Sequence, residues 1–259
     1  MVNLKNYSVG IKYFVLFLTF TLGISGCQQK LYVSRIVGKE IPITDQNNEV
    51  SGIKDFIKPY RERIDQDLNT VLAYAPETLD KSGEWQSAIG NLFADVVLKK
   101  GNPIFMAREK KSIDLVLLNH GGIRSIIPKG NVTARTAFEI MPFENSLVVV
   151  ALKGEQIIEM IQYIIKEKKP HPLTGMTFII DKNSEPKTIL IQGAPLDNNK
   201  IYYVGTNDYL SNGGDNMVFF KKGVQKYDLD YKLRNILIDY FKEVDTLPVV
   251  IDKRIFVEK

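Results

Sequence analysis

The segment 117–124 combines residue types that could bind a small anion. An apolar run, 113–118, ends in Asn119, His120, two glycines and then Arg124. A buried strand that ends in a glycine turn can present backbone N–H groups, and a guanidinium behind the turn adds a fixed positive charge. The alternative is a structural turn whose arginine pairs with a carboxylate. The segment alone does not distinguish the two.

Two further segments place an aromatic ring beside polar groups on a loop. The ring is Phe143 in residues 141–147 and Tyr209 in residues 206–217. The accompanying polar and glycine residues are Asn145 in the first segment and Gly213, Gly214 and Asp215 in the second. Two rings from separate loops can sandwich a planar heterocycle, at about 1–3 kcal/mol per stacked base, and a carboxylate can accept both hydrogens of a vicinal diol. Core or turn packing of the rings and a tight glycine turn are the structural alternatives.

The N-terminal residues predict export and lipid attachment. Lys5 and Lys12 precede an apolar run that is too short to span a membrane comfortably, and small residues lead to Cys27. This pattern is typical of a bacterial lipoprotein signal peptide over residues 1–26, with Cys27 as the lipidation site. An ordinary signal peptide with an incidental cysteine is the alternative. We therefore expect a lipid-anchored membrane protein on the periplasmic or cell-surface side, with residues 27–50 as a tether.

Charge and cysteine content exclude several classes of protein. Two lysines are the only charged residues of the signal peptide, so 32 basic and 30 acidic residues remain, too near neutral for a basic nucleic-acid-binding face. Cys27 is the only cysteine, which excludes a disulfide and leaves His120 and His171 without partners for a zinc finger. The remaining length is enough for one large domain, expected over 51–259.

Hydrophobic periodicity predicts helices interleaved with strands. Helices are expected over 51–68, 87–100, 155–169 and 229–243, the second of them ended by the Gly-Asn-Pro sequence at 101–103. Strands are expected over 113–118, 146–152, 176–181, 187–192, 200–205 and 248–257. Short turns between several strands indicate hairpins. The expected fold is therefore α+β, a mixed sheet with packed helices.

Taken together and in order, these segments resemble the C-terminal domain of the bacterial and animal 5′-nucleotidase family. The family's pattern is an asparagine with glycines and an arginine, then Pro-Phe-x-Asn, Leu-x-Gly and Asn-Asp-aromatic-Leu-x-x-Gly-Gly-Asp. Its counterparts here are residues 119–124, 142–145, 152–154 and 207–215. Residues 89–97 also resemble the family's Leu-Gly-Asn-Leu-x-x-Asp helix. The resemblance covers about residues 51–257 and implies the mixed fold of that domain.

In that family this domain holds the nucleoside, which implies base contacts for four residues. Phe143 and Tyr209 would stack on the base. Asn145 would lie on the base side, and Asn119 would contact the base edge or the ribose.

The resemblance implies sugar and phosphate contacts for the other loop residues. Arg124 would contact the ribose and the α-phosphate, and Asp215 the ribose hydroxyls. Gly213 and Gly214 belong to the same substrate-binding loop. His120 stands where glycine is common, and we expect it to cap the turn.

The sequence departs from the family in two ways. Members often carry another ligand-binding arginine shortly before the Gly-Asn-Leu helix, but residues 81–91 have Gly83 and Trp85 there and no arginine. Without that arginine, the bound anion loses a direct charged hydrogen bond, which would contribute about 1.5–3 kcal/mol to its binding. The family's hydrolysis also belongs to a separate metallophosphatase domain whose two metal ions need Asp, Asn and several His ligands. With two histidines and no such segment, we expect no catalytic residue, metal or cofactor in this sequence.

Three hypotheses follow from these observations. The chain is the substrate-binding half of a split 5′-nucleotidase, whose divalent metal pair lies in a separately encoded metallophosphatase. Alternatively, it is a lipoprotein that binds nucleosides or nucleotides without chemistry, or a structural domain that has lost its ligand. The retained site residues argue against the third, and Arg124, where a reacting phosphate needs it, favours the first. We therefore expect hydrolase activity only together with a partner.

Overall fold

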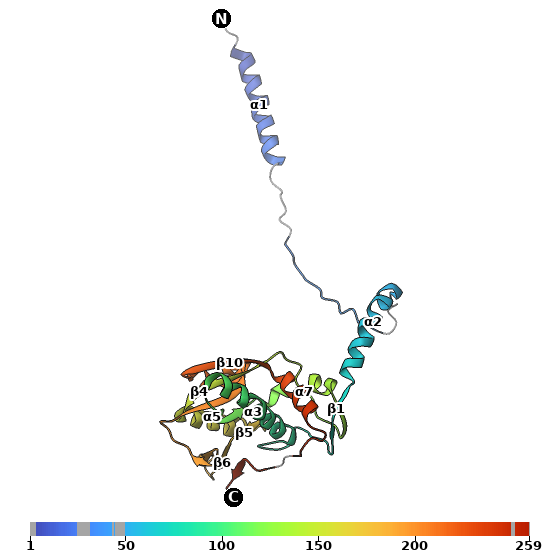
Figure 1. Ribbon diagram of the computed structural model, residues 1–259. Helices are drawn as coiled ribbons and strands as arrows, with labels where there is room; N and C mark the ends of the chain where they lie inside the picture. The colour runs from blue at the N-terminus through green and yellow to red at the C-terminus, as the bar shows by residue number, and fades with distance from the viewer. Residues whose placement is uncertain (1–3, 25–31, 43, 45–49, 250–251, 259) are drawn as a thin grey trace. The chain divides into compact units, whose positions relative to one another are not determined.

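The computed structural model describes residues 4–24, 32–42, 44, 50–249 and 252–258 (Figure 1). The chain divides into two units, Met1–Ser51 and Gly52–Lys259. The first holds helix α1, Leu4–Ile24. Across the described ranges, no helix has the length and apolarity that crossing a membrane requires. Cys27, the predicted lipidation site, lies outside the described residues.

The second unit contains the sheets and the remaining helices. The α-helices are α2 (Ser51–Leu68), α3 (Ala88–Glu109), α4 (Ala134–Ile140), α5 (Gly154–Glu167), α6 (Asp208–Ser211) and α7 (Leu233–Glu243). Short 3-10 helices are η1 (His120–Gly122), η2 (Gly214–Asn216) and η3 (Val218–Lys222). The strands are β1 (Val71–Ala75), β2 (Leu115–Leu117), β3 (Gly130–Thr133), β4 (Ser146–Lys153), β5 (Leu173–Thr174), β6 (Met176–Ile180), β7 (Pro186–Ile191), β8 (Ala194–Pro195), β9 (Ile201–Asn207), β10 (Gln225–Lys232) and β11 (Ile255–Val257).

The central sheet has five strands in the order β10-β4-β9-β2-β5. In it β2 runs parallel to β9, whereas the other neighbouring strands are antiparallel. A four-stranded sheet, β11-β6-β7-β8, and the pair β1-β3 complete the unit. The expected mixed sheet with packed helices is confirmed.

Strand β4 is apolar on both sides because helices cover both faces of the central sheet. Leu147 and Val149 lie in one core with residues of α3 and α7. Val148 and Val150 lie in a second core with residues of α5. Side chains of a strand alternate between faces, so a sheet covered twice needs a continuous apolar run.

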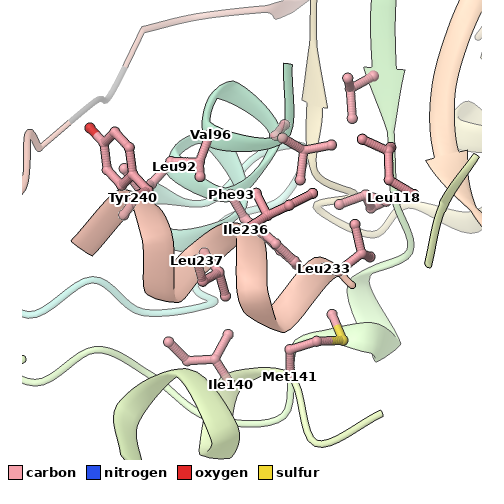
Figure 2. Close-up of a cluster of buried hydrophobic side chains, with 14 of the residues drawn as sticks. Leu92, Phe93, Val96, Leu118, Ile140, Met141, Leu233, Ile236, Leu237 and Tyr240 are labelled. Atoms are coloured by element: carbon pink, nitrogen blue, oxygen red, sulfur yellow. The ribbon is translucent and has the colours of Figure 1, made fainter. Parts of the chain in front are cut away.

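The first core also fixes the start of a functional loop. Figure 2 shows α7 between α3 and α4, with Leu233, Ile236 and Leu237 facing both neighbours. Met141, which directly follows α4, is buried in this core. The loop that carries Phe143 therefore begins at a fixed point.

Helix α3 continues through the expected Gly-Asn-Pro stop to Glu109, so the predicted end at residue 100 is wrong. Packing explains the difference. A Cβ on Gly101 would lie 2.5 Å from Leu147 Cδ2, so the glycine lets the helix approach β4 closely. Asn102 Oδ1 accepts a hydrogen bond from the Ile113 N–H at 2.8 Å. These contacts outweigh the backbone hydrogen bond that Pro103 cannot make.

Two other predicted elements are shorter in the structure. The helix expected over 229–243 begins at Leu233, because residues 225–232 form β10 and pair with β4. The strand expected over 248–257 is reduced to β11 among the described residues. In β10 the apolar Tyr227, Leu229 and Tyr231 alternate with polar residues, a strand pattern that the helix prediction from residue 229 overlooked.

Candidate functional site

The loop after β2 presents an asparagine and an arginine in different environments. Asn119 is buried, whereas the Arg124 side chain is exposed. The backbone N–H of Arg124 donates to the Ile140 carbonyl at 2.8 Å, and its Nη1 donates to the Gly121 carbonyl at 3.2 Å. The guanidinium is thus held at the loop and keeps donors free for a ligand.

Asn119 joins this loop to the one that follows β9. Its Nδ2 donates to Asp215 Oδ2 at 2.6 Å, across 96 positions of sequence. A Cβ on Gly122 would lie 2.7 Å from Asn119 Oδ1, so a side chain there would displace the asparagine. The hydrogen bond and the small residue together set the position of the Asp215 carboxylate.

Tyr209 holds the same carboxylate from its other side. Its hydroxyl donates to Asp215 Oδ1 at 2.9 Å, and the Asp215 N–H donates back to that hydroxyl at 3.1 Å. Gly213 has a φ of 86° and Asp215 a φ of 50°, both in the left-handed region. That conformation favours glycine, which the chain has at residue 213. Gly214 lies against the Tyr209 ring, where a Cβ would be 2.5 Å away. Tyr163 adds a hydrogen bond from its hydroxyl to the Asp215 carbonyl at 2.8 Å.

Arg234, on α7, holds the loop that carries Phe143. Its side chain is buried, and Nη1 donates to the carbonyls of Met141 at 3.4 Å and Pro142 at 3.3 Å. Nη2 pairs with the Glu144 carboxylate, and this hydrogen bond lowers the pKa of Glu144. Arg234 therefore fixes the loop backbone, while the Phe143 side chain stays exposed.

These loops surround one cavity of about 350 Å³. It is lined by Asn119, Gly121, Gly122, Arg124, Phe143, Asn145, Tyr209 and Asp215. Gly213 and Gly214 line an adjoining depression that shares Asn145 and Tyr209 with the cavity. The structure therefore brings all eight predicted binding residues together.

The two aromatic rings are available for contact. Phe143 is 43% exposed and Tyr209 is 48% exposed. Core packing, one of the two structural alternatives, is therefore wrong for both residues, whereas the Tyr209 ring does pack on the turn at Gly214. Two exposed rings on separate loops beside a fixed carboxylate can hold a planar group attached to a diol.

Lys81 lies beside the loop that carries Arg124 and is not among the residues predicted for the site. Its Nζ donates to the Ile123 carbonyl at 2.7 Å, and burial followed by the charge of Arg124 lowers its pKa. Lys81 is brought to this loop by two backbone hydrogen bonds between Leu79 and Ile127, at 2.8 and 2.9 Å. No local sequence pattern predicts such a long-range pairing.

A buried histidine supports the first loop. The N–H of His120, the first residue of η1, donates to His171 Nδ1 at 3.2 Å. Burial lowers the pKa of His171 to about 4, so this imidazole is neutral at neutral pH and can accept that hydrogen bond.

The donor set does not fit the metal pair that the resemblance implies for hydrolysis. Across residues 4–24, 32–42, 44, 50–249 and 252–258, no group of three or more His, Cys, Asp or Glu side chains could hold a metal ion. The arrangement is suited to binding.

Comparison with known proteins agrees with the geometry. A family model described as "5′-nucleotidase, C-terminal domain" matches residues 69–222. The NAD 5′-nucleotidase of Haemophilus influenzae is 31% identical over 202 residues, which are 71% of this chain and 34% of that protein. The trifunctional nucleotide phosphoesterase YfkN of Bacillus subtilis is 24% identical over 79% of this chain and 15% of its own length.

Solved structures show the same fold. A 5′-nucleotidase precursor from Thermus thermophilus superposes with a TM-score of 0.66 at 26% identity, over 81% of this chain and 43% of that one. The chain thus spans less than half the length of the relatives described here.

Proposed function

Because the chain belongs to the 5′-nucleotidase C-terminal domain family, we propose that it is the nucleotide-binding half of a split 5′-nucleotidase. A separate metallophosphatase polypeptide supplies the metal pair and the activated water. This chain supplies recognition of the nucleotide, and the pair hydrolyses its phosphoester.

The cavity between the three loops carries the proposal. Phe143 and Tyr209 offer faces for a base, and Asp215, held by Asn119 and Tyr209, offers acceptors for the ribose hydroxyls. Arg124 lies in the same cavity with donors for a phosphate oxygen. A nucleotide combines these three chemical groups in one ligand.

The assignment of catalysis to a second polypeptide rests on ligand chemistry. Two-metal hydrolysis needs several metal ligands around both ions. The described part of this chain offers no such group, and the whole sequence holds two histidines. The named relatives that this chain matches are nucleotide-hydrolysing enzymes of greater length.

An AMP hydrolysis assay with Mn²⁺ or Co²⁺ tests the proposal. It uses this protein alone, a candidate metallophosphatase encoded beside it, and the two together. We expect phosphate release from the mixture that exceeds the partner's own rate. Activity of this protein alone would contradict the argument from metal ligands. AMP binding without any gain on mixing would instead favour a binding lipoprotein.

Lipid attachment at Cys27 completes the proposal and has its own test. The anchor would hold the binding domain on the periplasmic or cell-surface side of a membrane. Labelled palmitate should be incorporated into the protein in a bacterial host and be absent from a Cys27→Ser variant. Equal labelling of both would exclude Cys27 as the attachment site.

A further inference from the structure

Helix α2 carries an apolar stripe that no other described part of the chain covers. The members of the stripe recur at helical spacing along one side of the helix and are Ile53, Phe56, Ile57, Tyr60, Ile64 and Leu68. No residue of α2 is buried, and Phe56 and Tyr60 are 69% and 61% exposed. Their rings contact each other, with centroids 5.8 Å apart. Among the described residues, neither core of the domain includes a residue of α2.

The charged residues of α2 are sorted around this stripe. At 3.6 residues per turn, Lys54, Arg61 and Arg63 lie roughly 70–90° from its centre and border it on both sides. Asp55 and Glu62 lie roughly 170° away, on the opposite side of the helix. The other charged residues of the helix lie between these positions and are Lys58, Asp65 and Asp67.

This sorting is typical of a helix that lies in the interface between water and lipid. The apolar side of such a helix enters the boundary between headgroups and acyl chains. Cations at the borders of the stripe can lay their aliphatic stems on the acyl chains and extend their charged ends to the lipid phosphates. Acidic side chains on the opposite side remain in water. A protein partner would not require cations on both borders, so the sorted charges favour lipid.

The C-terminal end of α2 is attached to the domain that holds the candidate site. Arg135, on α4, pairs through Nη2 with Asp65 Oδ1 at 2.8 Å, and its Nε donates to Asn69 Oδ1 at 3.0 Å. Asn69 is also the first residue that the family model matches. The stripe therefore lies outside the matched domain, although α2 is bound to it.

The predicted lipid anchor would keep α2 close to a membrane. Residues 28–50 separate Cys27 from Ser51, and a chain of that length spans at most about 80 Å when fully extended. A lipid at Cys27 would thus raise the effective concentration of the helix at the bilayer surface.

We propose that α2 lies flat in the surface of a phospholipid bilayer, with the stripe among the upper acyl chains and the bordering cations at the level of the phosphates. This inference rests on the membrane location in the proposed function and adds the surface that contacts the lipid. Because Arg135 attaches α2 to α4, the contact would also restrict how the domain is oriented at the membrane.

Quenching by brominated lipids tests this placement on the full chain. Tyr60→Trp puts a fluorophore in the stripe, and Glu62→Trp puts the same fluorophore on the opposite side of the helix. Each is reconstituted in vesicles of phosphatidylethanolamine and phosphatidylglycerol, with or without bromine on the upper acyl chains, and the vesicle-bound protein is recovered by flotation. We expect bromine to remove most of the emission that Tyr60→Trp adds to that of Trp85. The emission added by Glu62→Trp should persist.

Phe56→Asp provides a matched control, because Phe56 is exposed and lies outside both cores. Combined with Tyr60→Trp, it places a charge in the stripe and should restore the emission in brominated vesicles, since burying an unpaired charge in lipid is costly. Adenosine binding by Phe56→Asp should equal that of the native protein, because the residues that line the cavity lie on other elements.

Equal emission of Tyr60→Trp in brominated and plain vesicles would overturn the proposal. A second copy of the chain or a protein partner on the stripe would give that result, and sedimentation of the protein alone and with the candidate metallophosphatase would tell these two occupants apart. Quenching of both tryptophan variants alike would also overturn it, because the helix would then have no lipid-facing side.

The readout separates this inference from the proposed function. Emission is measured on vesicle-bound molecules, so quenching that persists with Cys27→Ser supports the placement of α2 even if lipid attachment fails. A native protein that binds no nucleotide would contradict the proposed function and leave the quenching result unchanged.

Discussion

Tyr209 combines an exposed ring with a hydroxyl that positions Asp215, so one side chain serves two parts of a ligand. The residue is 48% exposed, whereas its hydroxyl takes part in two hydrogen bonds with Asp215. The sequence predicted that the Tyr209 ring stacks on a base. It could not identify the hydrogen bonds, because they depend on the left-handed backbone at Asp215.

The two parts of Tyr209 can be separated by substitution. Tyr209→Ala removes ring and hydroxyl, and should weaken adenosine binding by about 1–3 kcal/mol or more, the range for one stacked base. Tyr209→Phe keeps the ring and should retain most of that affinity, with a smaller loss from the freed Asp215 carboxylate. Calorimetric titration of both variants measures the difference. Equal losses would show that stacking contributes nothing.

At the scale of the element, contacts between helices and loops decided features that local patterns could not predict. The helical period located α2, α3 and α5. It did not predict that α3 passes Pro103, because the reason lies in the contact of Gly101 with β4. The three site loops were predictable from their motifs, whereas Lys81 was not, since its place depends on the bridge between Leu79 and Ile127.

Gly101 provides a test of this close packing. Alanine normally favours a helix over glycine by about 1 kcal/mol. At Gly101 the new Cβ would lie 2.5 Å from Leu147 Cδ2 and 3.3 Å from Ile113 Cδ1, so we expect Gly101→Ala to destabilise the domain by about 1–3 kcal/mol. Gly52→Ala in α2, where nothing lies within 4 Å, should not destabilise it. Urea unfolding measures both, and a stabilised Gly101→Ala variant would contradict the close approach.

Arg234 links α7 to the Phe143 loop, so its removal should affect both stability and binding. Arg234→Met leaves the carbonyls of Met141 and Pro142 without their side-chain donor. We expect a loss of about 1–3 kcal/mol in the free energy of unfolding and weaker adenosine binding. Glu144→Gln is the matched control, because Glu144 is exposed and its pairing with Arg234 is open to solvent. A similar effect of both variants would mean that the ion pair, not the carbonyl contacts, holds the loop.

For the molecule as a whole, His171 makes stability depend on pH in a defined window. Its pKa is about 4 in the folded protein against an ordinary value of 6.5, so the unfolded chain binds the additional proton between these values. Stability is therefore fully present above pH 6.5 and falls as the pH decreases toward 4. The shift corresponds to a loss of up to about 3 kcal/mol. Protonation also removes the acceptor that His171 Nδ1 offers to His120.

Urea unfolding at pH 7 and pH 5 checks this dependence. His171→Asn keeps an acceptor of similar reach without a titrating group, so the difference between the two pH values should be smaller in that variant. The carboxylates titrate in both proteins and cancel in the comparison. An identical pH dependence would exclude His171 as its source.

In the proposed nucleotide site, Asp215 would also set which sugars are accepted. An ionised carboxylate has about four lone-pair positions, and Asn119 and Tyr209 occupy one on each oxygen. One position remains on each oxygen, which matches the paired 2′- and 3′-hydroxyls of a ribonucleotide. Because both oxygens are fixed before a ligand arrives, this acceptor pair is preorganised and does not adapt to a sugar with one hydroxyl. The site is therefore expected to discriminate against 2′-deoxyribonucleotides, and thus to distinguish the breakdown products of RNA from those of DNA.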